Sequence, residues 1–237
     1  MKTFAHERPF ERTVRLFGEE GAARIAAART IVVGTGGVGG WCAEALVRTG
    51  MGRVTLVDPD SVCESNINRQ TMATSETVGQ PKAEALRARL LAVNPAADVI
   101  AVAERYSAET AGRFDFAEYD FVVDAIDSVR DKAALARRAL ASPEVKFFSS
   151  MGAARRTDPL RVRVSDFWKV HGDGLARALR AEFRRNGMPP RPFQCVWSDE
   201  LPAEASLPGG TAMHVTAVFG LVLAHLVIRE AAAGSGA

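Results

Sequence analysis

Cysteine is scarce in this sequence, and that scarcity excludes two classes of protein. Only three cysteines occur in 237 residues, Cys42, Cys63 and Cys195, and no two of them form a CxxC pair. A disulfide framework needs paired cysteines and a cysteine-rich zinc site needs closely spaced ones, so we expect neither. The pattern suits a reducing compartment.

Long apolar segments and a strong overall charge are also missing. Residues 1–8 contain no apolar core of the kind found in a signal peptide. The longest apolar stretch, Val215 to Ile228, contains His225 and falls short of the roughly 20 residues that span a bilayer, so we expect a buried helix. The net charge of +2 indicates that any basic patch must be local. We therefore expect a soluble, cytoplasmic protein with no integral membrane segment.

A glycine-rich turn between two β-branched runs is the most informative feature that is present. Residues 31–33 lead into the turn, a helix-like stretch follows it, and residues 54–57 end at Asp58. The turn contains Gly34, Gly36, Gly37 and Gly39. Without Cβ atoms the backbone can approach a phosphate closely, and Asp58 stands near the position of a carboxylate that holds a ribose hydroxyl. We favour a nucleotide-binding βαβ unit over a purely structural turn.

The segment after Asp58 is polar, and then helical and extended patterns alternate. Residues 59–70 are rich in Asn, Arg and Gln without regular periodicity, which favours a functional loop. A helix is predicted from Lys82, with Pro81 near its first turn, and Asn94 followed by proline should stop it. Residues 99–102 read as a strand, and Ser107 as the N-cap of a short helix.

Two carboxylates, Asp124 and Asp127, follow a buried strand that starts at Phe121. Ligands bind at the carboxyl ends of strands in open α/β sheets, so both carboxylates are candidate site residues. Asp127 could bind Mg²⁺ through oxygen, or it could cap the helix predicted over residues 129–141.

The regular alternation of strand and helix predicts an α/β fold. We expect a Rossmann-like, doubly wound, largely parallel sheet with helices on both faces. We assign residues 1–150 to a nucleotide-binding core. Residues 151–237 form a C-terminal part that completes the sheet, with a basic segment and a terminal helix.

The basic segment is local and hidden by the modest net charge. Residues 151–191 contain ten arginines and lysines against four acidic residues, a local charge of +6. Arg177, Arg180 and Arg184 recur at helical spacing and should share one helix face. This face is either merely solvated or a nucleic-acid contact. The candidate contacts are Arg155, Arg156, Arg177, Arg180 and Arg184.

Several short motifs occur together and in a fixed order. They are Gly34-x-Gly36-Gly37-x-Gly39, Asp58-x-Asp60, Asn66-x-Asn68-Arg69-Gln70, Val78-Gly79-x-x-Lys82 and Asp124-Ala125-x-Asp127-Ser128. This set resembles the ThiF/MoeB superfamily, the adenylating relatives of ubiquitin-activating enzymes. Within it, residues 15–19, 43–50, 124–135 and 158–166 look like the bacterial tRNA threonylcarbamoyladenosine dehydratases.

The resemblance implies that ATP adenylates a carboxylate, with Mg²⁺ as a further cofactor. By this analogy Asp58 holds the ribose, Arg69 and Lys82 neutralise the phosphates with help from Asn68, and Asp127 binds Mg²⁺ or orients the attack. In a homodimer, Arg12 (or Arg15) would reach the partner's ATP. The implied cofactor-binding set is Gly34, Gly36, Gly37, Gly39, Asp58, Asp60, Asn68, Arg69, Gln70, Lys82, Asp124, Asp127 and Ser128.

The resemblance also implies the substrate, which is threonylcarbamoyladenosine in tRNA. The activated carboxylate would be attacked from within the same side chain, closing a ring with loss of water. Because that nucleophile is intramolecular, no catalytic cysteine is required, and Cys195 reads as a small buried residue rather than a nucleophile. A sulfur-acceptor or cysteine-desulfurase relay protein is a further partner that the resemblance leaves open.

Two other interpretations stand beside this one. The first is an adenylyltransferase that activates the C-terminal carboxylate of a small ubiquitin-like or sulfur-carrier protein, against which the missing CxxC pairs count. The second is a non-catalytic or NAD-binding Rossmann module, which has less need of Arg69 and Lys82. Residues 168–174 differ from the dehydratase pattern and fall in the half expected to contact tRNA.

Overall fold

A single seven-stranded sheet organises the chain, in the order β3-β2-β1-β4-β5-β7-β6. The computed structural model describes residues 9–202 and 209–234. The strands are β1 (Arg29–Val33), β2 (Arg53–Val57), β3 (Asp98–Val102), β4 (Phe121–Asp124), β5 (Lys146–Ser150), β6 (Val162–Asp166) and β7 (Gln194–Ser198). All pairings are parallel except that of β6 with β7. The predicted α/β, largely parallel sheet is therefore confirmed.

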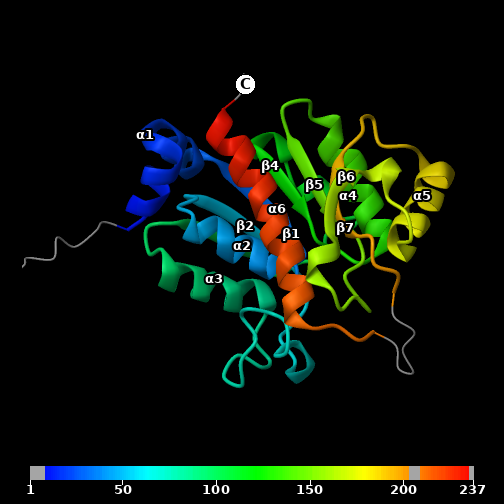
Figure 1. The fold of residues 1–237 in the computed structure, drawn as a ribbon, viewed down its shortest axis with the longest axis horizontal. Coiled ribbons are helices and arrows are strands. Elements are labelled where there is room, and N and C mark those ends of the chain that lie inside the picture. The colour runs from blue at the N-terminus through cyan, green and yellow to red at the C-terminus, as the bar shows by residue number, and fades with distance from the viewer. Residues whose placement is uncertain (1–8, 203–208, 235–237) are drawn as a thin grey trace, which may run out of the picture.

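Helices cover both faces of this sheet (Figure 1). The α-helices are α1 (Glu11–Ala27), α2 (Gly39–Arg48), α3 (Lys82–Val93), α4 (Val129–Ala141), α5 (Gly174–Asn186) and α6 (Met213–Ala233). Short 3₁₀ helices are η1 (Glu64–Asn66), η2 (Ala111–Arg113), η3 (Phe116–Glu118), η4 (Pro159–Arg161) and η5 (Phe167–Lys169). One core joins α1, α2, α3 and α6 to the sheet, and the other joins α4 and α5 to the opposite face.

The strands alternate between these two cores with the period of two that extended chain imposes. On β1, Val32 packs into the core of α2 and α6, while Ile31 and Val33 pack into the core of α4. Phe147 and Phe148 on β5 divide in the same way. Residues that are buried on both sides explain why these strands read as continuous apolar runs. The sheet and both cores include residues on either side of residue 150, where the sequence analysis divided the chain into two parts.

The terminal helix is longer than the apolar run that predicted it. α6 has 21 residues, and by length and composition alone it could cross a membrane, but over half of it is buried within the protein. Its buried side packs chiefly on α2 and α1. A Cβ on Gly220 would lie 2.3 Å from the carbonyl oxygen of Val38, so the backbones of α6 and α2 meet there. The predicted buried helix is confirmed.

Two helix ends differ from a simple pattern: α1 is interrupted, and the cap predicted at Ser107 is wrong. The helix before β1 begins at Glu11 and is interrupted at Gly18, whose φ is 74°. Ser107 does not cap a helix: its hydroxyl donates to Glu109, and the helical turn begins only at Ala111, preceded by Thr110. A serine hydroxyl can form a hydrogen bond with a neighbouring carboxylate as readily as with the end of a helix. The residue type alone therefore predicted the cap at the wrong position.

Substitution of Gly220 by alanine tests the contact of α6 with α2. We expect Gly220→Ala to lower the free energy of unfolding by about 1–3 kcal/mol, because the added methyl overpacks a backbone contact. Denaturant unfolding measures this change. The control is Gly174→Ala, where a Cβ has open space, and where a change of no more than about 1 kcal/mol is expected. Equal stability of the two variants would contradict the close approach.

Candidate nucleotide-binding site

A cavity of about 1090 Å³ lies at the carboxyl ends of the parallel strands. Its walls come from the turns after β1, β2, β4 and β5, from Leu175 at the start of α5, and from residues 209–216 before and within α6. The strand order reverses between β1 and β4, with α2 on one face and α4 on the other. Open α/β sheets bind ligands at such a switch point.

The glycine turn forms the floor of the cavity and makes two close backbone contacts. Gly34 has a φ of 90°, and a Cβ there would lie 2.7 Å from the carbonyl oxygen of Ala125. A Cβ on Gly39 would lie 1.8 Å from the carbonyl oxygen of Gly34, so only glycine lets α2 start there. Gly36 and Gly37 line the cavity, while Gly39 does not. Gly39 thus supports the turn through packing.

Asp58 is held in one orientation at the end of β2. The backbone N–H of Thr35 donates to Oδ2 of Asp58 at 2.7 Å, and the N–H of Asp60 donates to Oδ1 at 3.0 Å. The side chain is nearly buried and lines the cavity beside the glycine turn. A carboxylate fixed by backbone donors keeps lone pairs for a sugar hydroxyl.

Two cations predicted to meet phosphates lie in the same cavity. Lys82, the first residue of α3, pairs with Asp60 at 2.7 Å (Nζ to Oδ2) and is almost buried. Arg69 donates from Nη1 to the carbonyl of Ser65 at 2.7 Å and to Oδ1 of Asn68 at 3.0 Å. Asn68 does not line the cavity but donates to the carbonyl of Thr211 at 2.8 Å, which ties Arg69 to the segment before α6.

The structure changes the role that we expected for Asp124. Its side chain is fully buried and does not line the cavity. Asp124 pairs with the fully buried Lys132 at 2.8 Å, accepts from the Ser149 hydroxyl at 2.7 Å and accepts from the N–H of Ile126 at 3.1 Å. Lys132 also donates to the carbonyl of Ile126 at 2.9 Å. Both polar backbone groups of Ile126 are therefore fixed, and with them the loop that leads to Asp127.

Burial raises the pKa of Asp124, while Lys132 and Ser149 oppose that rise. A buried pair is costly to desolvate, and losing one partner leaves an uncompensated charge. Replacement by apolar residues would often be harmless to stability. We therefore interpret the pair of Asp124 and Lys132 as a means of positioning the loop at residues 125–128 rather than as a source of stability.

Asp127 differs from the other carboxylates of the cavity. Asp58 is bound by backbone N–H groups, Asp60 pairs with Lys82, and Asp131 pairs with Arg105 at 2.7 Å. Asp127 is exposed at the cavity wall, next to Ser128, and no hydrogen bond or ion pair of its carboxylate is recorded over residues 9–202 and 209–234. Within those ranges no cluster of three metal-binding side chains occurs.

Three further cavity residues were not predicted. The hydroxyl of Tyr106 is buried without a hydrogen-bond partner among the described residues, as is Oε1 of Gln70, which the sequence did predict. Burial raises the pKa of Tyr106 to about 12. Cys63 is exposed in the cavity, and a hydrogen bond with Ser65 lowers the pKa of its thiol. Tyr106, Cys63 and Arg105 lie outside regular elements, where the sequence carries no periodic signal.

Cys195 is buried on β7, and burial raises the pKa of its thiol to about 12. A protonated, inaccessible thiol fits the interpretation of this residue as a small core residue.

Arg12 lies far from the cavity of its own chain. Phe10, just before α1, packs against Gly50, which follows α2 at the end opposite the glycine turn. Because α2 runs for ten residues between these points, about 15 Å separates them along the helix axis. Arg12, two residues after Phe10, therefore lies at the end of α2 that is remote from the cavity.

The basic segment after Met151 divides into internal and outward-facing residues. Arg156 is buried and pairs with Asp173 at 3.6 Å, so it is not on the surface predicted to contact tRNA. Arg180 lies over the Phe167 ring, 5.3 Å from its centroid, and donates to the carbonyls of Phe167 and Val170. Arg155, Arg177 and Arg184 are exposed, which a contact with tRNA requires.

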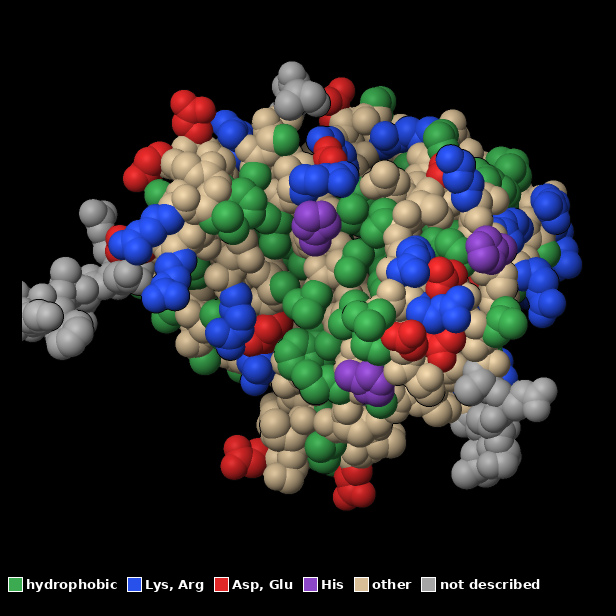
Figure 2. All heavy atoms as spheres, in the orientation of Figure 1, with side chains coloured by type: hydrophobic (Ala, Val, Ile, Leu, Met, Phe, Trp, Pro, Cys, Tyr) green, Lys and Arg blue, Asp and Glu red, His purple; other side chains and the backbone are tan. Residues whose placement is uncertain are grey.

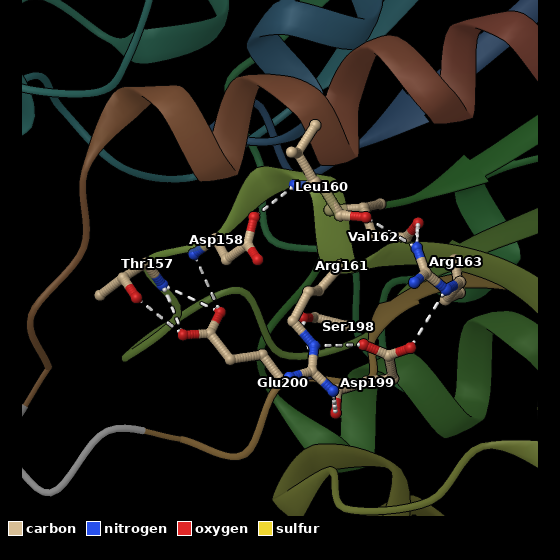
Figure 3. A network of polar contacts seen from close by, with 9 residues as sticks. All are labelled: Thr157, Asp158, Leu160, Arg161, Val162, Arg163, Ser198, Asp199 and Glu200. Carbon is tan, nitrogen blue, oxygen red and sulfur yellow. Dashed lines mark hydrogen bonds and ion pairs between the residues drawn. The ribbon is translucent and has the colours of Figure 1, made fainter.

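Other arginines of this segment form the polar network in Figure 3. Asp199, just after β7, binds Arg161 at 2.7 Å and Arg163 at 3.1 Å. Glu200 accepts hydrogen bonds from both the N–H and the hydroxyl of Thr157. The hydrogen bond from Arg161 lowers the pKa of Asp199. These contacts hold residues 157–163 against the end of β7. They also pair two arginines that the charge count for residues 151–191 had treated as unpaired.

The fold and cavity together define a nucleotide-binding α/β protein of the Rossmann type. A family model described as "ThiF family" matches residues 10–232. The chain belongs to the ThiF family.

Two proteins that are similar over nearly the whole chain are dehydratases. The tRNA threonylcarbamoyladenosine dehydratase of Bacillus subtilis is 35% identical, over 93% of each chain. The structure of Escherichia coli TcdA, solved in complex with AMP, superposes with a TM-score of 0.89 at 36% identity and covers 95% of this chain and 94% of that one. The molybdopterin-synthase adenylyltransferase of Escherichia coli is 34% identical over 74% of this chain and 68% of its own.

Removal of Lys132 tests the buried pair. We expect Lys132→Met to lower the free energy of unfolding by about 3–5 kcal/mol, because Asp124 loses its only ion-pair partner among the described residues. The double variant Asp124→Asn/Lys132→Met removes both charges and should recover about half of that loss or more. Thermal and denaturant unfolding measure both. A double variant no more stable than the single one would contradict the charge-pair interpretation.

Proposed function

We propose that this protein is an ATP-dependent tRNA threonylcarbamoyladenosine dehydratase. The observation that carries the proposal is the extent of the cavity. It runs from the glycine turn and Asp58 to the loop after β5, at Gly152, and to Leu175 on α5. One end suits a nucleotide, and the other opens toward the basic segment. Full-length likeness to dehydratases supports the same reading.

The residues that line the cavity support adenylation of a carboxylate. Asp58 would bind the ribose, and the amides of Gly36 and Gly37 would face the phosphates. Arg69 and Lys82 would neutralise the charge that builds up as the carboxylate oxygen attacks the α-phosphorus and pyrophosphate leaves. A nucleophile in the same threonylcarbamoyl side chain then attacks the acyl carbon, and AMP leaves with the oxygen. The net change is ring closure with loss of water.

Asp127 fits Mg²⁺. It is the one cavity carboxylate that forms no hydrogen bond or ion pair within the described residues, although its charge acts on Arg105. Mg²⁺ is commonly held by one or two carboxylates together with substrate phosphates, and would there offset phosphate charge. The loop that holds Asp127 is fixed by Lys132 and Asp124.

A second candidate function is adenylation of a small carrier protein. The likeness to molybdopterin-synthase adenylyltransferase favours it. The lack of CxxC pairs in this chain counts against it, and the dehydratase likeness covers more of the chain.

Nucleoside mass spectrometry tests the reaction and the substrate together. After incubation with ATP, Mg²⁺ and tRNA that carries threonylcarbamoyladenosine, we expect this nucleoside to lose one water. Arg69→Ala and Lys82→Ala should each slow the conversion by about 100-fold or more, because each removes charge stabilisation at the phosphates. Arg113→Ala, at an exposed ion pair outside the cavity, is the control. No loss of water, together with carrier-dependent exchange of pyrophosphate into ATP, would instead establish the second function.

We further propose a homodimer formed through the outer face of α6. Figure 2 shows hydrophobic side chains gathered on the face that α6 crosses. Met213 and Leu221 on α6 and Leu160 on η4 are exposed. Antiparallel packing of two α6 helices would bring the C-terminal end of one, where α1 packs, beside the cavity end of the other. That arrangement would deliver Arg12 to the partner's nucleotide.

A charge on the α6 face should break the dimer. We expect Leu221→Glu to be monomeric by light scattering and to lose activity, since a buried carboxylate at the contact is costly. Met188→Glu, at an exposed methionine after α5, is the matched control and should stay dimeric. A dimeric Leu221→Glu protein would place the interface elsewhere.

We assign adenylation to residues 1–150 and tRNA binding to residues 151–237. Arg155, Arg177 and Arg184 remain the outward-facing candidates for phosphate contacts. A tRNA substrate also favours a cytoplasmic location.

A further inference from the structure

Trp168 differs from the other two tryptophans in its exposure. Trp197 is buried, and Trp41 is half-buried and donates to the carbonyl of Arg69. Trp168, in η5 between β6 and α5, keeps 37% of its surface exposed. An exposed tryptophan presents a large flat apolar surface that commonly marks a contact site.

The ring of Trp168 is held in place from beneath. It meets the ring of Phe167 edge-on at 5.0 Å between centroids and lies 6.3 Å from the ring of Phe183. Phe167 is fully buried and stacks on Phe193 at 4.9 Å. The backbone N–H of Trp168 donates to Asp166 at 2.8 Å. A ring ordered before binding loses little conformational entropy when a ligand stacks on it.

The surroundings of this ring are basic. Arg180 lies over Phe167, Lys169 is the next residue, and the exposed Arg184 is one helical turn beyond Arg180. No ion pair of Lys169 or Arg184 is recorded among the described residues. Two carboxylates also lie nearby: Asp166 accepts from the N–H of Trp168, and Glu182 accepts from Asn186 at 2.6 Å, so the three cations outnumber them. A flat aromatic surface among cations suits a polyanion that carries flat bases.

The position relative to the cavity also fits an RNA strand. α5 begins at the cavity, where Leu175 forms part of the wall, and Phe183 lies eight residues further on, against Trp168. This spacing is about 12 Å along the helix. A nucleotide with its side chain in the cavity therefore has neighbours within reach of Trp168, along a helix that exposes Arg177 and Arg184.

We propose that Trp168 is a stacking platform for an unpaired RNA base near the nucleotide that enters the cavity. The proposal rests on the function proposed above for its substrate, tRNA. Unpaired bases in loops are available to stack on aromatic side chains, whereas paired bases are not. The site should therefore favour single-stranded RNA over a duplex of equal length.

Tryptophan fluorescence and steady-state kinetics test this proposal. Single-stranded RNA should quench the emission of the wild-type protein, and Trp168→Leu should abolish the quenching component. Trp168→Leu, which keeps apolar packing on Phe167 and Phe183, should raise the KM for tRNA by about fivefold or more, and Trp168→Tyr should stay within about twofold. The KM for ATP should not change. Met188→Leu is the control at another exposed apolar position.

The outcomes separate this proposal from the proposed function. If the wild type dehydrates tRNA and Trp168→Leu keeps the wild-type KM for tRNA, the stacking proposal is wrong. If the wild type does not dehydrate tRNA but RNA still quenches Trp168, the reaction is misassigned and the stacking site stands. Equal quenching by duplex and single strand, or none by either, overturns the proposal and directs attention to a protein partner at this surface.

Discussion

The contact between the glycine turn and the loop after β4 is the constraint on which the site depends. Gly34 approaches the carbonyl of Ala125 so closely that no side chain fits between them. One residue further, Ile126 is bound through its N–H to Asp124 and through its carbonyl to Lys132. Because two strands with helices on opposite faces meet here, the cavity opens at this point, and a close backbone contact joins its two walls.

Charge in the C-terminal part serves two separate purposes. Arg156, Arg161 and Arg163 pair with Asp173 or Asp199 and hold the polypeptide between β5, β6 and β7. Arg177 and Arg184 face outward on α5, beside the rigid ring of Trp168. The surface charge offered to a polyanion is therefore smaller than the sequence count of +6 but concentrated along one helix that begins at the cavity.

α6 links the second half of the chain to the first. Its buried side closes the core over α1 and α2, and the segment before it receives the hydrogen bond from Asn68 through Thr211. Asn68 in turn accepts from Arg69. The position of a cation in the N-terminal half thus depends on residues about 140 positions later, which explains why the cavity is complete only with both halves present.

The α/β class, the glycine turn, the position of Asp58 and the family could be predicted from the sequence, because they depend on local periodicity and on residues close together in the chain. Lys82 and Arg69 were also found by motif and do line one cavity. Three features became clear only from the folded structure: Asp124 is buried, Arg156 is internal, and Trp168 is exposed beside α5. The side chain of an aspartate, an arginine or a tryptophan can be buried or exposed. Its burial depends on partners that are distant in the sequence, such as Lys132, Asp173 and Phe183.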